Sequence, residues 1–281
     1  MPDAPSEPQP FRATTDGAVL AGEEIGEGPA VLLLHGLTAT RRYVVHGALT
    51  IPRAGYRVIA YDARGHGEST GAADYSYAAL VDDALAVLDD RGVDRAAVVG
   101  QSMGAATAAA LAIQRPERVA ALGLVTPAHR GSRARSIEYW DRLADGLDAG
   151  GVDGFLEALE PLSVPDKWRE PVRTVIRQRM ERHADLENVS AALRGVQRTT
   201  AFDSLDALER ITAPTLVVGS RDEVDADHPL AIAEDYAGRV PGARLEVEDE
   251  GESPLAWRGG ALSKALLEHF ADAGWTPAEP A

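Results

Sequence analysis

The sequence predicts an α/β protein with a doubly wound, mainly parallel sheet and an inserted helical cap. Three observations support this prediction. Short apolar runs typical of buried strands alternate along the chain with segments of helical periodicity. A Gly-x-Ser-x-Gly pentapeptide at residues 100–104 lies where one such run meets a helix. Between residues 127 and 211 the alternation stops, and only helical patterns remain.

Composition favours one large α/β domain with an insertion and excludes several kinds of site. The chain has 281 residues, of which 45% are hydrophobic, and it contains no cysteine. The length suffices for an α/β domain with an insertion, and the lack of cysteine excludes disulfides, thiolate catalysis and cysteine-based metal sites. A net charge of −16 disfavours nucleic acid and anionic membranes as partners. We expect a cytoplasmic protein with a small-molecule substrate and no metal or cofactor, and the sequence leaves its oligomeric state open.

The first elements alternate as a parallel sheet requires. Residues 1–9 are acidic and rich in proline, which predicts a flexible leader. Ala30–Leu34 is a continuous apolar run, as expected of a strand buried on both faces. Arg57–Tyr61 repeats the pattern, and Tyr77–Leu88 then carries apolar residues at helical spacing until Arg91-Gly92 ends the helix.

The next strand carries the candidate nucleophile. Ala96–Val99 leads into Gly100-Gln101-Ser102-Met103-Gly104 and then into an alanine-rich helix, Ala105–Ile113. So tight a turn between strand and helix admits only small flanking residues. It lifts the serine hydroxyl above the edge of the sheet, at the amino end of a helix. The pattern therefore identifies Ser102 as the candidate nucleophile.

The strand Val119–Val125 is followed by a stretch that we interpret as a cap over the sheet edge. Residues 127–211 contain no convincing buried strand. Glycine and proline divide them into helical segments at Ser136–Asp148, Val152–Leu159, Pro171–His183 and Leu186–Gln197. Four aromatic residues are expected to form either the cap core or the wall of a pocket, namely Tyr139, Trp140, Phe155 and Trp168.

After the cap the strand pattern returns. Thr215–Val218 and Arg244–Val247 are predicted to be the last two strands, and Ala261–Phe270 an amphipathic terminal helix. We therefore expect a core of residues 10–126 and 212–281, interrupted by a cap at 127–211. Strands joined through helices form right-handed crossovers, which leave helices on both faces of the sheet.

Four motifs give the chain a resemblance to the α/β-hydrolase superfamily, in its lidded branch with a serine nucleophile. In family order and at family spacing, they are Leu-Leu-Leu-His-Gly-Leu at 32–37, Tyr-Asp-Ala-Arg-Gly-His-Gly-Glu-Ser at 61–69, the pentapeptide at 100–104, and Ala-Pro-Thr-Leu-Val-Val-Gly-Ser-Arg-Asp at 213–222. The resemblance covers nearly all of the chain outside the leader. It implies the α/β-hydrolase fold and nucleophilic attack by Ser102 on an acyl group.

The resemblance also implies roles for other residues. Attack on an acyl carbon creates an oxyanion that needs preorganised N–H donors, and the family supplies them from the backbone at the positions of Leu37 and Met103. Asp222 follows the strand Thr215–Val218, where the family has the triad acid that orients a histidine. His35 and His66 correspond to histidines with structural parts.

The base of this triad is missing from its expected position. Family members have Gly-His after the last strand, whereas this chain has Gly251-Glu252. We predict that Glu252 occupies the histidine position, near Asp222 and facing the Ser102 hydroxyl, where two close carboxylates would resist ionising together. His228, in the loop that leaves the acid strand, and His129, at the entry to the cap, are the possible substitute bases.

Three functions are compatible with this pattern. The first is a serine hydrolase that cleaves a small ester, lactone or thioester through Ser102 with an atypical base. The second is a non-hydrolytic enzyme on the same fold, catalysing an elimination, decarboxylation or cyclisation in small-molecule biosynthesis. The third is a catalytically silent ligand-binding protein. We favour the hydrolase, and the intact serine turn argues against a silent protein because a binder has no use for it.

Overall fold

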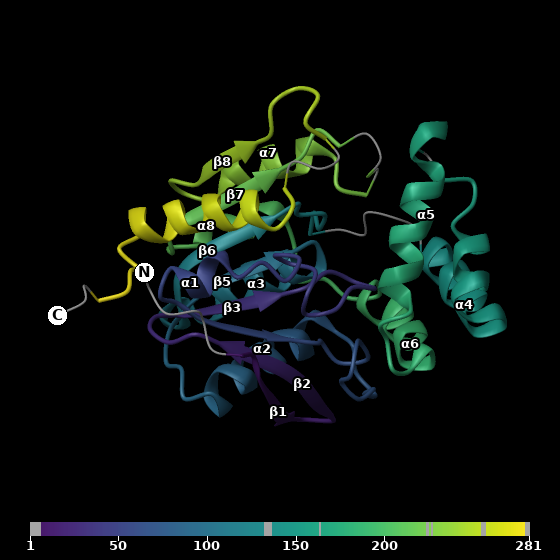
Figure 1. Ribbon diagram of the computed structural model, residues 1–281, viewed down its shortest axis with the longest axis horizontal. Helices are drawn as coiled ribbons and strands as arrows, with labels where there is room; N and C mark the ends of the chain where they lie inside the picture. The colour runs from purple at the N-terminus through teal and green to yellow at the C-terminus, as the bar shows by residue number, and fades with distance from the viewer. Residues whose placement is uncertain are drawn as a thin grey trace.

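The computed structural model describes residues 7–131, 137–162, 164–222, 225, 227–253 and 257–278. Within them an eight-stranded sheet forms the centre of the molecule (Figure 1). Its strands are β1 (Gln9–Thr15), β2 (Ala18–Ile25), β3 (Ala30–Leu34), β4 (Arg57–Tyr61), β5 (Ala96–Gln101), β6 (Val119–Val125), β7 (Thr215–Gly219) and β8 (Arg244–Val247). They lie in the order β1-β2-β4-β3-β5-β6-β7-β8. All pairs from β4 to β8 are parallel, which confirms the α/β class with a mainly parallel sheet.

An antiparallel hairpin at the edge of the sheet was not predicted. β1 pairs with β2, and β2 pairs antiparallel with β4. The pattern of β1 is mixed, since only Phe11 and Ala13 are buried, so no continuous apolar run marks it. The predicted leader ended at residue 9, yet Gln9 already belongs to β1. Residues 1–6 of that leader lie outside the described residues.

Helices cover both faces of the sheet because successive side chains of each buried strand point to opposite faces. Leu32 of β3 and Val98 of β5 pack with α2 (Tyr77–Asp90), α3 (Met103–Gln114) and α7 (Leu230–Arg239). The neighbouring residues Leu33 and Val99 pack on the other face with α1 (Thr50–Arg53) and α8 (Gly260–Asp272). Short 3₁₀ helices occupy Pro116–Arg118 and Leu205–Arg210. The two-sided burial explains why these strands are apolar throughout.

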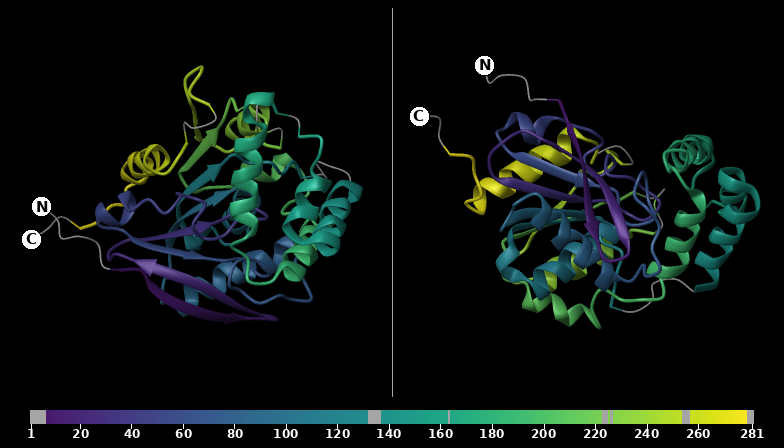
Figure 2. Two further views of the ribbon diagram at one scale, coloured as in Figure 1. Left: turned by 45° about the vertical axis from the view of Figure 1, so that its right-hand side comes forward. Right: turned by 90° about the horizontal axis from the view of Figure 1, so that it is seen from below.

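Between β6 and β7 the described residues form helices and no strand. These are α4 (Ile137–Ala158), α5 (Asp166–Met180) and α6 (Leu186–Val196). Figures 1 and 2 show them gathered at one end of the molecule, beside the sheet rather than on either face. The two helices predicted for residues 136–159 form one element with a break at Gly150 and Gly151, where φ is −141° and 57°. We retain 127–211 as the proposed cap and 10–126 with 212–281 as the proposed core.

No helix in the described part of the chain combines the length and the apolar character needed to cross a bilayer.

Candidate active site

Ser102 lies in a strained turn between β5 and α3. Its φ of 54° and ψ of −111° are rare for a residue with a side chain. The turn is closed by contacts that leave no room beside the serine. A Cβ on Gly100 would lie 2.0 Å from the carbonyl oxygen of Gly104, and a Cβ on Gly104 would lie 2.1 Å from that of Leu34. Glycine at 100 and 104 is therefore required by packing, and the serine is held at the carboxyl end of β5.

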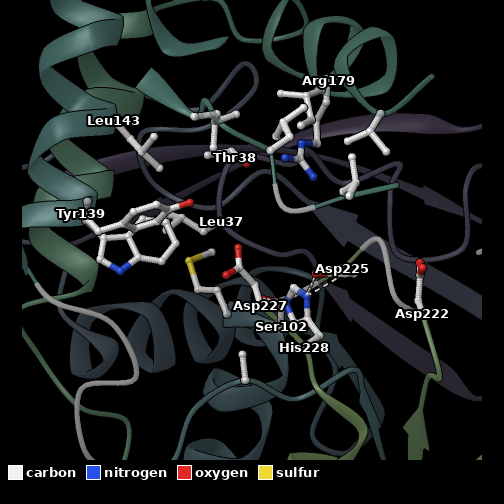
Figure 3. A pocket seen from close by; sticks show the side chains of 18 of the residues that line it. Leu37, Thr38, Ser102, Tyr139, Leu143, Arg179, Asp222, Asp225, Asp227 and His228 are labelled. Atoms are coloured by element: carbon white, nitrogen blue, oxygen red, sulfur yellow. Dashed lines mark hydrogen bonds and ion pairs between the residues drawn. The ribbon is translucent and has the colours of Figure 1, made fainter. Parts of the chain in front are cut away.

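The side chain that contacts Ser102 is His228 (Figure 3). His228 lies in the loop between β7 and α7, and its Nε2 is 2.7 Å from the Ser102 Oγ. Its Nδ1 is 2.8 Å from both carboxylate oxygens of Asp225. Because the carboxylate can only accept, the proton belongs on Nδ1, and Nε2 accepts from the Ser102 hydroxyl. Serine, imidazole and carboxylate thus have the arrangement that can activate a hydroxyl nucleophile.

The charges around His228 favour its protonated form. Burial opposes the imidazolium, but the hydrogen bond and negative charge of Asp225, with a contribution from Asp227, outweigh it and raise the pKa of His228 above 6.5. Burial also opposes the charge of the Asp225 carboxylate. The hydrogen bond from His228 has the larger effect, so the pKa of Asp225 is lowered below its ordinary 3.8. Asp225 is therefore suited to stabilise the imidazolium that forms when His228 takes a proton.

The prediction for Glu252 is wrong. Its carboxylate accepts a hydrogen bond of 3.3 Å from the backbone N–H of Asp249, and the residue is exposed. It does not belong to the lining of the cavity that contains Ser102. Glu252 therefore lies in a surface turn after β8, and the imidazole in contact with the serine comes from the loop after β7.

Glu248, just after β8, has a buried carboxylate that binds the first residues of the loop that carries His228. Its Oε1 accepts from the Ser220 hydroxyl and from the backbone N–H of Arg221, both at 2.7 Å. The Ser253 hydroxyl also donates to Oε1, and Trp257 Nε1 donates to Oε2 at 3.0 Å. Through these hydrogen bonds Glu248 connects Ser253 and Trp257, which follow β8, with Ser220 and Arg221, which follow β7.

The carboxylate in contact with the imidazole is that of Asp225 and not that of Asp222, the acid predicted from the sequence. Asp222 lines the cavity, but Figure 3 shows its side chain apart from His228. The prediction assumed a histidine from the β8 loop. Since the histidine comes from the β7 loop itself, an acid three residues before it is the one within reach. The Asp-x-x-His spacing was the signal that could have identified Asp225.

His129 lines the same cavity without contacting the serine. Its Nε2 accepts from the backbone N–H of Ala201 at 3.3 Å. Its ring packs edge-on against Phe202 at 4.7 Å and lies 5.4 Å from Tyr77. These contacts make His129 part of the cavity wall, and the imidazole in contact with Ser102 is that of His228.

The predicted oxyanion-hole residues lie beside the serine. Leu37 and Met103 both line the cavity that contains Ser102. Their loops approach closely, since a Cβ on Gly36 would lie 3.3 Å from the Ser102 Cβ. This proximity supports the role of the two backbone N–H groups, which stays a prediction.

Three buried histidines hold the loop that contains Leu37. His35 Nε2 accepts from the N–H of Ala63 at 2.9 Å, and His66 Nε2 accepts from the N–H of Thr38 at 3.3 Å. His183, between α5 and α6, donates from Nε2 to the Thr38 carbonyl at 3.0 Å. Its Nδ1 accepts from the backbone of the 61–69 segment, 2.8 Å away. Because each ring accepts one N–H, each must be neutral, and burial lowers the pKa of all three.

Acid is therefore expected to destabilise the protein through these histidines. Burial lowers the pKa of His183 from 6.5 to about 4, so the unfolded chain binds the proton first, and stability falls as the pH drops from 6.5 towards 4. For His183 alone the loss approaches roughly 3 kcal/mol of unfolding free energy. Urea unfolding at pH 7.5 and 4.5 measures it. In a His183→Gln variant the free energy should depend less on pH, and an equal dependence in both proteins would contradict the assignment.

The site opens into a cavity of about 980 Å³ beneath the cap. Its core side carries Ser102 and His228, and its cap side is largely apolar, with Trp140 and Leu143 from α4 and Trp168 from α5. This volume lies at the upper end of the range for small-molecule sites. In the described part of the chain, no group of three or more His, Cys, Asp or Glu side chains is arranged to hold a metal ion.

Comparison with known proteins gives consistent results over most of the chain. The family model described as alpha/beta hydrolase fold matches residues 29–258. A putative carbamate hydrolase, RutD, from Variovorax paradoxus is 33% identical over 249 residues, which cover 87% of this chain and 92% of the relative.

Solved structures agree with the sequence matches. A thermophilic esterase from Thermogutta terrifontis with malate bound superposes with a TM-score of 0.79 and 27% identity, covering 94% of this chain and 99% of that one. An enol-lactonase from Burkholderia xenovorans gives a TM-score of 0.76 and 25% identity, with 93% and 100% coverage.

Proposed function

The chain belongs to the α/β-hydrolase family, and from this premise we propose that it is a serine hydrolase that cleaves a small carboxylic ester, lactone or thioester. Ser102 is the nucleophile, His228 the general base and Asp225 the acid that orients it. The observation that carries the proposal is the contact of 2.7 Å between the Ser102 Oγ and the His228 Nε2.

The proposed reaction has two halves. His228 Nε2 takes the hydroxyl proton while Ser102 Oγ attacks the carbonyl carbon, and the N–H groups of Leu37 and Met103 bind the oxyanion. The tetrahedral intermediate collapses to an acyl-enzyme, and the imidazolium gives its proton to the departing alcohol or thiol. A water molecule then loses a proton to His228 and attacks the acyl group, and the imidazolium returns that proton to the Ser102 Oγ as the acid is released. Asp225 stays ionised throughout and stabilises the imidazolium.

Two further points support hydrolysis over the other functions considered. A non-hydrolytic reaction was attractive because the family base seemed to be absent, and the contact between Ser102 and His228 removes that reason. A silent binding protein has no need for the positive φ of Ser102, which costs of order 1–3 kcal/mol. The similarity to an esterase and to an enol-lactonase supports an acyl substrate. Because another relative is a putative carbamate hydrolase, a carbamate is the first further substrate class to test.

A fluorophosphonate probe, which phosphonylates an activated serine with loss of fluoride, tests the proposal. We expect covalent labelling of the wild-type protein and none of Ser102→Ala. The base must be neutral to accept the proton, and the pKa of His228 is raised above 6.5. The labelling rate should therefore fall as the pH drops through a value above 6.5.

Mass spectrometry of the labelled peptide identifies the modified residue. Glu252→Ala is the matched control, since its side chain lies in a surface turn, and it should be labelled like the wild type. Labelling that persists in Ser102→Ala would overturn the proposal.

A further inference from the structure

A half-buried arginine of the cap faces the proposed catalytic residues. Arg179 lies in the last turn of α5 and lines the cavity. Figure 3 shows its guanidinium pointing towards the space above Ser102, Asp227 and His228. It is close enough for its charge to act on both Asp225 and His228. A positive group of the cap thus stands across the cavity from the nucleophile.

Arg179 differs from the other arginines of its helix. Arg169 pairs with Asp166 at 2.9 Å, Arg173 with Glu160 at 2.5 Å, and Arg177 with Asp153 at 2.5 Å. By contrast, the Arg179 Nε is buried without a hydrogen-bond partner. No carboxylate in the described part of the chain forms an ion pair with it. None of these three paired arginines lines the cavity, whereas Arg179 does.

An arginine in this state favours an anionic ligand. Burial opposes the charge of the Arg179 guanidinium and lowers its pKa. A buried donor such as its Nε, without an acceptor, costs about 1–3 kcal/mol of folding free energy. A carboxylate matches the planar guanidinium with two parallel hydrogen bonds. A doubly charged phosphate suits the site less, because Asp225 and Asp227 already contribute negative charge nearby. The balance favours a ligand with a single negative charge.

Apolar side chains of the cap indicate an apolar body for the same ligand. Trp140, Leu143 and Trp168 line the cavity with Arg179. A ligand that satisfies both features has a hydrocarbon segment between the acyl group at Ser102 and an anionic end at the cap.

We propose that Arg179 binds a free carboxylate of the substrate, so that the enzyme prefers half-esters of dicarboxylic acids, or lactones that carry a carboxylate, over neutral esters. The proposal rests on the proposed hydrolase function and specifies its substrate class. Arg179 then acts as a specificity-determining residue. The competing role, in which Arg179 only offsets the charges of Asp225 and Asp227, would affect all substrates equally through His228.

The two roles are separated by paired substrates of equal shape. Methyl half-esters of dicarboxylic acids with four to eight carbons are compared with the matched methyl ester amides, in which an amide replaces the carboxylate. In the wild type, the ratio of kcat/KM for acid over amide should exceed about 10 at one or more chain lengths. In Arg179→Gln that ratio should fall by about 10- to 100-fold. In Arg177→Gln, a matched surface change on the same helix, it should stay as in the wild type.

A ratio near one at every chain length in the wild type, or an unchanged ratio in Arg179→Gln, would overturn the inference. Its failure is distinguishable from that of the hydrolase proposal, because hydrolysis of 4-nitrophenyl acetate tests Ser102 without a carboxylate. If that reaction is absent, tryptophan fluorescence decides the inference by binding alone, since Trp140 and Trp168 line the cavity. Dicarboxylates with four to eight carbons should then quench the wild type and Arg177→Gln but not Arg179→Gln, and equal quenching of all three would refute it.

Discussion

Replacement of His228 by alanine is expected to lower kcat for 4-nitrophenyl acetate by about 10⁶-fold, the cost of removing the base of a serine triad. The Ser102 hydroxyl donates to the Nε2 of this imidazole at 2.7 Å, and without it the hydroxyl proton has no acceptor in the same position. Initial rates, corrected for the uncatalysed reaction, measure the effect. Circular dichroism and urea unfolding of the variant separate it from loss of folding.

Two control variants test Glu252 and His129, the other residues that the sequence analysis considered as the base. Glu252→Ala should keep kcat within about threefold, because a surface change away from the reacting atoms is close to neutral. His129→Gln should change activity far less than His228→Ala, because His129 bonds to the backbone of Ala201 and not to Ser102. Near-wild-type activity in His228→Ala, with activity lost in either control, would refute the assignment.

Asp225→Asn is expected to lower kcat by about 10⁴-fold, as the loss of the triad acid does elsewhere. The amide can present its NH₂ group to Nδ1, which favours the wrong tautomer of His228. Asparagine also removes the negative charge that raises the pKa of His228. The acid limb of the kcat/KM profile should therefore move to lower pH in the variant. A profile from pH 5 to 9 with 4-nitrophenyl acetate measures both effects.

Asp222→Asn provides the matched comparison, since it makes the same chemical change in the same loop. Its side chain lies apart from His228 in Figure 3, so activity should fall by less than about tenfold and the acid limb should stay in place. If Asp222→Asn shifted the limb and Asp225→Asn did not, the family position of the acid would be the functional one after all.

Much of the fold followed from local patterns. Ala30–Leu34, Arg57–Tyr61 and Val119–Val125 were predicted with the bounds that the structure has. Each is buried on both faces of the sheet, so its apolar run is continuous and visible without an alignment. The edge strand Gln9–Thr15 was missed because one face of it is exposed and its pattern resembles a polar loop.

The site was predictable only in part. Ser102 was found because its turn needs glycine at 100 and 104. These glycines lie within two residues of the serine, so the sequence shows the requirement directly. The partner could not be found in this way, because His228 lies 126 residues from Ser102 along the chain. The resemblance pointed to a histidine after β8, where this chain has a turn with Glu252.

The sequence by itself determined the class of fold, the strand and helix that frame the nucleophile, and the serine, since each depends on neighbours within a few residues. The tertiary structure alone decided which imidazole and which carboxylate lie beside that serine, because the loop after β7 brings Asp225 and His228 to the end of β5. It also decided the place of Arg179 in the cavity lining, since no helical pattern distinguishes this side chain from Arg173 or Arg177. Contacts between distant segments depend on packing in three dimensions, so short-range sequence patterns do not predict them.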